Sequence, residues 1–362
     1  MGPTNELGLP SISRKSYTIA GIAVTVFGLD ELTFDAAEIA CLWLLHPRLA
    51  TQESMFGVAD TILNDWNKSK RPSLEDVKLV TMGLIAVTFD QRNHGTREID
   101  PLVNKSWKQG NPRHAQDLFS IFQGTARDVS LLIDCIPAYI FPTPEKTVTE
   151  HIVLGVSLGG HAAWSCLFHE PRITCGVVII GCPDYVNLMA DRARLSKLPS
   201  WVNGDPPGSQ FLGSEDFPLP LLEAVRKYDP AGLLLSQIDI HSIDHHQPLR
   251  ENPLPDPPEI DKQILLPLMK RCLSGKRILI LSGGVDKLVP YHRGEPLLTW
   301  LKKAIAPNGW FADGRIHLED IIFEKAGHEM TSAMIEEASR FVGDYLSEDP
   351  ASTSSLVREA KI

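Results

Sequence analysis

Apolar runs of strand length recur along the chain and alternate with stretches of helical periodicity. The runs lie at residues 17–27, 83–89, 151–156, 176–180, 277–282 and 318–324. They are nearly continuous in Val, Ile and Leu, which is typical of strands buried on both faces of a sheet. Strands that alternate with helices predict an α/β fold, with a mostly parallel central sheet and helices on both faces.

Three further stretches have the spacing or composition of helices. Residues 126–136 repeat apolar side chains at helical intervals, and residues 160–168 form a small-residue helix start directly after one of the apolar runs. Residues 330–346 place Met334, Ala338, Phe341 and Tyr345 on one face. The first two fit crossover connections between parallel strands, and the third fits a terminal amphipathic helix.

A proline-rich segment interrupts this rhythm. Residues 199–258 contain 11 of the 27 prolines of the chain, and a regular parallel strand cannot be so rich in a residue that lacks an N–H donor. A solvated linker is the alternative, but apolar residues such as Phe211 and Phe217 lie between the prolines and argue for packing. We therefore predict a cap at 184–265 inserted into a core of 17–183 and 266–347, with tails at 1–16 and 348–362.

The net charge and the apolar content limit the partners that the chain can have. Lys and Arg number 35 and Asp and Glu 45, so the formal charge is −10, which repels nucleic acid and mildly favours uncharged substrates. No apolar run approaches the roughly 20 residues of a membrane-spanning helix, and the polar first 17 residues lack the apolar core of a secretory signal. We expect a cytoplasmic protein, although the final Ala-Lys-Ile loosely resembles a peroxisomal address.

The sequence Gly155-Val-Ser157-Leu-Gly159 follows directly on the residues His-Ile-Val-Leu at 151–154 and precedes a predicted helix. A serine on a tight turn between a strand and a helix requires small neighbours two residues away on either side. The helix that follows directs its amino-terminal dipole and free amides at the serine. The alternative is plain turn chemistry, but the strand before and the helix after are the context that a nucleophilic serine requires.

Two further residues follow buried strands and could activate this serine. Asp286 lies just beyond the run at 277–282, and His328 lies just beyond the last run at 318–324. A serine hydroxyl needs a base, and the base needs an acceptor to orient it. Separately, the aspartate could cap a helix and the histidine could be a solvated loop residue. All three residues are expected at the carboxyl ends of parallel strands, where open sheets hold their sites.

Together, these motifs resemble the α/β-hydrolase family over residues 17–346. The order Ser157, Asp286, His328 matches the order of the catalytic residues in the family. The turn at 89–95 (Phe-Asp-Gln-Arg-Asn-His-Gly) is similar to the turn after the family's fourth strand. Tyr-Asp-Pro at 228–230, together with residues 278–290, resembles the branch that contains dienelactone hydrolases, prolyl-oligopeptidase-like enzymes and small carboxylesterases. The resemblance implies Ser157 as nucleophile, His328 as general base and acid, and Asp286 as the residue that orients the imidazole. Asp184, after the preceding strand, is the rival acid.

The resemblance also implies an oxyanion hole formed by two backbone amides. Leu158, directly after the nucleophile, is expected to donate one. The family takes the other from the loop after its third strand, which we assign to Phe27-Gly-Leu29, so Leu29 is the expected second donor. Arg92 in the turn at 89–95 is expected to hold a carboxylate or a loop.

No metal or cofactor is expected. His241 and His245 have the i, i+4 spacing of metal ligands, but no second pair of ligands matches them, so we interpret them as polar residues of the cap. No glycine-rich phosphate loop is present.

These residues predict a serine hydrolase that cleaves a carboxylic ester, lactone or thioester of a largely uncharged small molecule. Two alternatives stay open: the same triad could serve an acyltransferase, a lyase or a carbon–carbon hydrolase, and the pocket could belong to a non-catalytic, ligand-binding relative. The sequence leaves the oligomeric state open.

Overall fold

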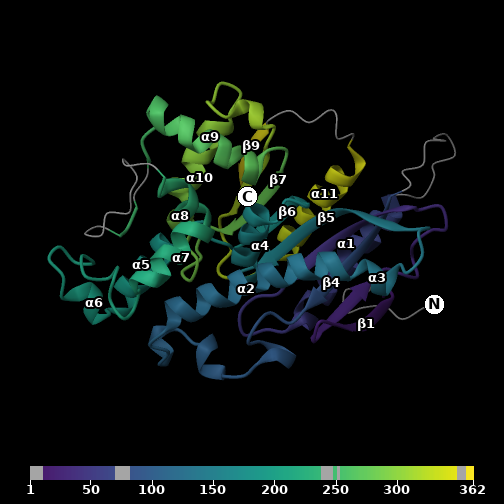
Figure 1. The fold of residues 1–362 in the computed structure, drawn as a ribbon, viewed down its shortest axis with the longest axis horizontal. Coiled ribbons are helices and arrows are strands. Elements are labelled where there is room, and N and C mark those ends of the chain that lie inside the picture. The colour runs from purple at the N-terminus through teal and green to yellow at the C-terminus, as the bar shows by residue number, and fades with distance from the viewer. Residues whose placement is uncertain (1–10, 70–81, 238–247, 251–252, 349–355) are drawn as a thin grey trace.

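The computed structural model describes residues 11–69, 82–237, 248–250, 253–348 and 356–362. Within this part of the chain, nine strands form one sheet in the order β1-β2-β4-β3-β5-β6-β7-β8-β9 (Figure 1). The strands are β1 (Arg14–Ile19), β2 (Ile22–Phe27), β3 (Glu38–Leu45), β4 (Gly83–Phe89), β5 (Thr147–Val156), β6 (Ile173–Ile179), β7 (Arg277–Gly283), β8 (His317–Phe323) and β9 (Leu356–Lys361). The pairs β1–β2 and β2–β4 are antiparallel, and all the others are parallel.

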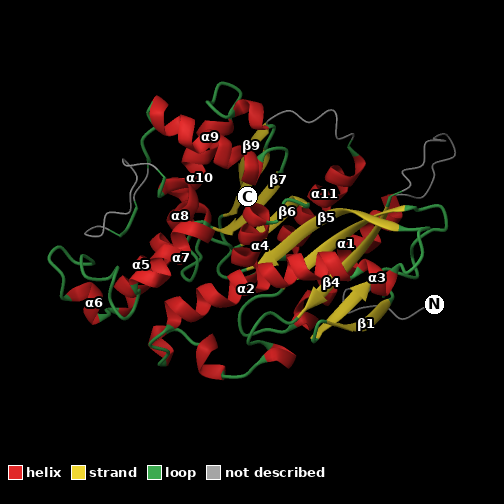
Figure 2. Cartoon of the chain, viewed as in Figure 1, coloured by secondary structure: helices red, strands yellow, loops and turns green. Residues whose placement is uncertain are grey.

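Helices cover the sheet on both faces (Figure 2). They are α1 (Phe56–Ser69), α2 (His114–Cys135), α3 (Pro137–Ile140), α4 (Leu158–His169), α5 (Tyr185–Ser196), α6 (Pro199–Val202), α7 (Leu219–Tyr228), α8 (Pro230–Leu235), α9 (Glu259–Leu273), α10 (Tyr291–Ile305) and α11 (Ser332–Ser347). The crossover β3–α1–β4 runs across the sheet in the opposite direction to β4–α2–β5, so right-handed connections put α1 and α2 on opposite faces. Helix α11 packs against α1, and α4 packs against α2.

The predicted α/β fold with a mostly parallel sheet is confirmed. Strands β4 to β8 correspond to five of the six apolar runs, and α2, α4 and α11 contain the helical stretches. Strands β4 and β7 are buried along their whole length, which explains why these runs are continuously apolar rather than alternating. Among the described helices, none has the length and apolar character needed to cross a membrane.

The first predicted strand was wrong in its extent. Residues 17–27 belong to two strands, β1 and β2, that form a hairpin around Ala20 and Gly21, with φ of 50° and 77°. Positive φ at both central residues is the geometry of a tight two-residue hairpin turn. Strand β3, at Glu38–Leu45, was missed. Its Ala, Glu and Leu residues suit a helix as well as a strand, and such a short apolar run has no periodicity that separates the two.

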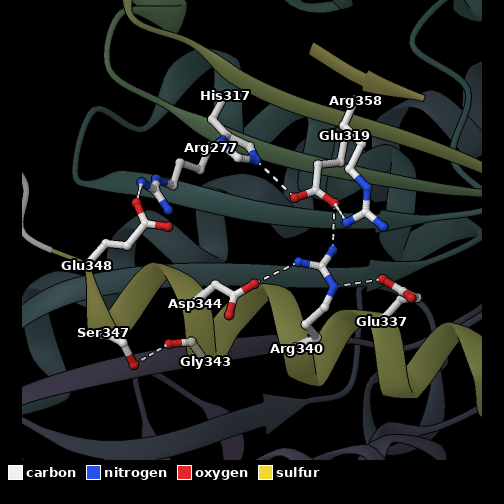
Figure 3. A network of polar contacts seen from close by, with 10 residues as sticks. All are labelled: Arg277, His317, Glu319, Glu337, Arg340, Gly343, Asp344, Ser347, Glu348 and Arg358. Carbon is white, nitrogen blue, oxygen red and sulfur yellow. Dashed lines mark hydrogen bonds and ion pairs between the residues drawn. The ribbon is translucent and has the colours of Figure 1, made fainter. Parts of the chain in front are cut away.

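The carboxyl-terminal residues add a strand that was also missed. Within the predicted tail at 348–362, residues Leu356–Lys361 form β9, parallel to β8 at the edge of the sheet. Buried Glu319 on β8 links this strand to the body of the protein, because it accepts hydrogen bonds from Arg358 on β9 (3.0 Å) and from Arg340 on α11 (2.5 Å) (Figure 3). The charged pattern of β9 concealed it, since edge strands carry charges more often than central strands do.

The segment predicted as a cap contains α5 to α8 and the first residues of α9. Helix α5 begins after the carboxyl end of β6, and Figure 1 shows α5 and α6 at the left of the molecule, whereas α7 contacts α2 and α4. Apolar side chains between its prolines are buried, including Phe211, Phe217 and Leu234. The division of the chain into a core and an inserted cap stays a prediction.

Candidate active site

Ser157 occupies the turn between β5 and α4. Its φ of 54° and ψ of −108° are strained for a residue with a side chain. The turn is held from the neighbouring strand, because the Ser157 amide donates to the Ile179 carbonyl at the end of β6 (2.9 Å). This backbone hydrogen bond to the neighbouring strand fixes the serine at the carboxyl end of the sheet.

The glycines around Ser157 are required by close backbone approach. A Cβ on Gly155 would lie 1.9 Å from the Gly159 carbonyl oxygen, and a Cβ on Gly159 would lie 2.1 Å from the Leu45 carbonyl oxygen. Neither contact is sterically allowed for any other residue. The predicted reason for the Gly-x-Ser-x-Gly pattern, that small residues let the turn close, matches this geometry.

Three predicted residues meet in one hydrogen-bonded series. The Ser157 Oγ lies 2.9 Å from His328 Nε2, and His328 Nδ1 lies 2.8 Å from Asp286 Oδ2. The two supporting turns pack closely, since a Cβ on Gly283 would lie 2.4 Å from the Gly327 carbonyl oxygen. Residues 157, 286 and 328 are thus brought together at the edge of the sheet where the carboxyl ends of the parallel strands β5, β7 and β8 lie.

The carboxylate of Asp286 is nearly inaccessible to solvent and is held by several donors. Its Oδ1 accepts hydrogen bonds from the amides of Leu288 (2.7 Å) and Val289 (3.0 Å), which leaves Oδ2 for the imidazole. Burial raises the pKa of Asp286, but the hydrogen bonds from His328, Val289 and Leu288 outweigh burial and lower it below its ordinary value. Asp286 is consequently an ionised acceptor that fixes His328 with Nδ1 protonated and Nε2 facing the serine.

The rival acid, Asp184, has different partners. It caps α5 by accepting from the Asn187 amide (3.0 Å), and it forms an ion pair with Arg250 (2.9 Å). Its side chain is fully buried, and the structure gives it no contact with His328. The position after β6 therefore holds a structural carboxylate.

The expected second oxyanion donor, Leu29, is wrong. Strand β2 is antiparallel to β4, with Val24 opposite Phe89 and Phe27 opposite Ala86. Its carboxyl end thus points toward the amino ends of the parallel strands, and Leu29 lies at the edge of the sheet opposite to Ser157. The error follows from the missed strand β3: the third strand of the chain is β3, and the loop after it begins at His46 and not at Phe27.

The loop that does lie beside Ser157 is the one after β3. Leu45 at the end of β3 is paired with Gly155, and the turn 47–49 lines the same cavity as Ser157. His46 holds this turn in place: its Nε2 accepts from the Gln91 amide (2.9 Å) and its Nδ1 faces the Pro47 carbonyl (2.8 Å). Burial lowers the pKa of His46 to about 4, so the ring is neutral and accepts at one nitrogen while donating at the other.

A cavity of about 280 Å³ opens in front of the serine. It is lined by Pro47, Arg48, Leu49, Leu118, Ser157, Leu158, His161, Arg192, Leu288 and His328. Sequence reasoning identified three of these residues and missed the others. The only local signal for them was the His46-Pro-Arg sequence directly after an apolar run; Leu118, His161 and Arg192 reach the cavity through tertiary packing alone.

The remaining predicted residues lie away from the cavity or outside the described part of the chain. Arg92 donates from Nε and Nη2 to the Asp128 carboxylate (3.1 and 2.9 Å), so the prediction that it holds a carboxylate is confirmed. His241 and His245 lie outside the described residues.

Comparison with known proteins adds similarity of fold. No protein-family model matches the sequence, and no curated protein matches it. The chain is similar to the solved structure of TT1662 from Thermus thermophilus, with 18% identity and a TM-score of 0.51 over 93% of this chain and 99% of that one. The esterase Pf2001 of Pyrococcus furiosus is 13% identical, with a TM-score of 0.45 over 96% of this chain and 98% of that one. At these identities the similarity concerns the fold, and the first structure supports it.

Proposed function

We propose that this chain, which has the α/β-hydrolase fold, is a serine hydrolase that cleaves a carboxylic ester, lactone or thioester through an acyl-enzyme. The observation that carries the proposal is the hydrogen-bonded series from the Ser157 Oγ through His328 to Asp286, with distances of 2.9 and 2.8 Å. These are the distances that proton transfer between nucleophile and base requires. The series opens into a cavity large enough for a small substrate.

In the first step, Ser157 attacks the substrate carbonyl as its proton passes to His328 Nε2. The Nδ1–H group of the resulting imidazolium donates to Asp286, whose negative charge stabilises it. Asp286 does not take up this proton, because its pKa is lowered by the hydrogen bonds that it accepts. The strained backbone at Ser157 keeps the Oγ in position to attack.

The negative oxygen that forms in this step needs two N–H donors. Leu158 is the first residue of α4, so its amide has no acceptor within the helix and adjoins the serine. The turn after β3 is the source that we propose for the second donor. Pro47 has no N–H, so the donor is the amide of Arg48 or Leu49, both of which line the cavity.

Breakdown of the intermediate completes the cycle. His328 returns its proton to the leaving alcohol, enol or thiol, which leaves an acyl group on Ser157. A water molecule then loses a proton to the same Nε2 and attacks the acyl carbonyl, and His328 gives this proton to the Ser157 Oγ as the acid is released. Each proton in this sequence is carried by His328.

The proposal is tested with a fluorophosphonate probe and a series of 4-nitrophenyl esters. Wild-type protein should be labelled and should hydrolyse short esters, whereas Ser157→Ala should lose labelling and at least about 10⁴-fold in kcat. Ser165→Ala is the matched control, because Ser165 is a buried serine on α4, the helix that follows Ser157, and it is outside the residues that line the cavity. Equal labelling of wild type and Ser157→Ala would contradict the proposal.

Analysis of products separates hydrolysis from the alternative reactions. Under the proposal, the acid accumulates in step with 4-nitrophenol, and added alcohol changes this ratio little. An acyltransferase would instead form mainly the new ester when alcohol is added.

A further inference from the structure

The cavity in front of Ser157 is lined by two arginines. Arg48 follows β3, and Arg192 lies on α5; both are partly buried. The other titratable side chains that line the cavity are His161 and His328, and none of its lining residues is acidic. Burial and the charges of Arg192, His328 and Arg48 lower the pKa of His161 to about 3, a shift that its hydrogen bond to Cys182 only partly offsets, so His161 is neutral. The cavity is therefore positively charged.

Neutral groups hold both guanidinium groups in place. Arg192 donates from Nη2 to the Leu288 carbonyl (2.9 Å), and its Nη1 lies 3.2 Å from His114 Nε2. His114 Nδ1 faces the Lys105 carbonyl (3.0 Å), so Nε2 is the acceptor, and burial together with the two arginines lowers the pKa of His114 well below its ordinary value. Arg48 donates from Nη1 to the Asn104 carbonyl (2.9 Å). These contacts position the arginines without cancelling their charge.

Neither arginine forms an ion pair with a carboxylate in the part of the chain that the structure describes. Other arginines of the same region do: Arg250 pairs with Asp184 (2.9 Å) and Arg293 with Asp191 (3.2 Å). Burial and the charge of Arg48 lower the pKa of Arg192 to about 10, which leaves it protonated at neutral pH. Two like charges that face one cavity raise the free energy of the empty site, and an anion between them would lower it.

We propose that the substrate of this site carries a carboxylate group besides its scissile ester, and that Arg48 and Arg192 bind this carboxylate. The proposal rests on the proposed function and names the substrate class for the same site. A guanidinium group matches a carboxylate with two parallel N–H donors, and Arg48 uses only one donor within the described protein. The cavity of about 280 Å³ limits such a substrate to a small molecule.

This substrate class differs from the uncharged one expected from the net charge of −10. The overall charge acts over long distances and is screened within about 10 Å at moderate salt. At contact, the two arginines determine the potential that a substrate meets. The proposal therefore replaces the expectation of an uncharged substrate.

Two matched pairs of esters test the proposal on the whole protein. Mono-4-nitrophenyl glutarate and 4-nitrophenyl valerate differ by a carboxylate on the acyl part, and 4-acetoxybenzoate and its methyl ester differ by a carboxylate on the leaving group. In at least one pair, wild-type kcat/KM should be about 10- to 100-fold higher for the anionic ester. The pair that shows the preference identifies which part of the substrate lies against the arginines.

Variants then connect the preference to the two arginines. Arg48→Gln and Arg192→Gln should each lower the ratio of anionic to neutral kcat/KM at least about 10-fold, mainly through KM, and Arg192→Lys should retain part of it. Because the ratio compares two esters on the same variant, it cancels any general loss of activity that follows from losing the hydrogen bond between Arg192 and the Leu288 carbonyl. Arg194→Gln is the matched control on α5, because Arg194 pairs with Asp191 and does not line the cavity; its ratio should equal that of wild type.

The outcomes separate this proposal from the proposed function. Ser157-dependent hydrolysis without preference for the anionic ester in either pair would overturn the carboxylate site and leave the hydrolase standing. If no ester is cleaved and Ser157 is not labelled, the hydrolase fails. In that case, the binding of glutarate and 4-hydroxybenzoate, measured by calorimetry, tests the carboxylate site. Binding that Arg192→Gln and Arg48→Gln each weaken at least about 10-fold would support the carboxylate site. The absence of binding to wild type would overturn it.

Discussion

The turns after β6 and β7 each carry a buried aspartate at the same edge of the sheet, but the two carboxylates have different partners. Asp286, after β7, accepts from two backbone amides and orients His328. Asp184, after β6, caps α5 and pairs with Arg250. Both positions are buried and follow a parallel strand, so position in the sheet alone does not distinguish a residue that orients a base from a residue that stabilises the fold.

The surroundings also shift the two carboxyl groups in opposite directions. Burial raises the pKa of Asp184, and neither Arg250 nor the Asn187 amide offsets it fully. The pKa of Asp286 is lowered, because the hydrogen bonds from His328 and two amides outweigh burial. The donors directed at each carboxylate therefore decide the direction in which its pKa shifts.

The strongest test of this difference is Asp286→Asn. The remaining oxygen of the new side chain would be held by the amides of Leu288 and Val289, so its NH2 group would face His328 Nδ1 as a donor and favour the wrong tautomer; kcat should therefore fall about 10³- to 10⁴-fold. Ester hydrolysis and the rate of fluorophosphonate labelling measure the effect, and far-ultraviolet circular dichroism verifies the fold. A loss below about 10-fold would mean that another carboxylate orients His328.

The matched change at the other turn, Asp184→Asn, should affect stability instead. It leaves Arg250 buried without its carboxylate, which should lower the free energy of unfolding by about 3 kcal/mol, while kcat of the folded protein stays within about 3-fold of wild type. Urea unfolding and ester hydrolysis measure the two quantities.

The partner variant shows whether the ion pair is the cause. Arg250→Gln should also be destabilised, and the double variant Asp184→Asn/Arg250→Gln should lose less than the sum of the two, because neither charge is then left unpaired. A stable Asp184→Asn protein with strongly reduced kcat would reverse the roles of the two turns.

The same comparison explains which parts of the site the sequence predicts. Ser157 lies between glycines that steric contact requires, and Asp286 and His328 directly follow strands whose apolar runs are unambiguous. For these three residues, the local sequence pattern is enough to predict where the residue lies in the folded protein. Strand β3 lacks such a pattern, because its residues suit a helix as well as a strand, and the assignment of Leu29 failed with it.

The residues that line the cavity from α5 show a different limit. Arg192, on α5, lines the cavity, and its position depends on hydrogen bonds to Leu288 and His114, which are distant in sequence. No motif contains these three residues. The substrate preference that we infer therefore depends on tertiary packing that composition and spacing do not reveal.

The smallest effect that we expect is a pH dependence of stability with opposite signs at the two turns. Asp229, whose carboxylate accepts from the Tyr185 amide beside Asp184 (3.1 Å), has its pKa raised well above 3.8 by burial and by the charge of Asp184. Between the unfolded and folded pKa values, the unfolded chain binds fewer protons, so this group's contribution to stability is lost as the pH rises above 3.8. The lowered pKa of Asp286 gives the reverse, a contribution lost as the pH falls below 3.8.

Urea unfolding between pH 3 and 8 measures both contributions as differences from wild type. The stability advantage of wild type over Asp229→Asn should shrink with rising pH, and its advantage over Asp286→Asn should shrink toward the acid end. The difference in the free energy of unfolding between wild type and variant is used, because the contributions of all the other titrating groups then cancel. If both advantages change in the same direction with pH, the two turns do not differ electrostatically, and the distinction between a structural and an orienting carboxylate would have to come from geometry alone.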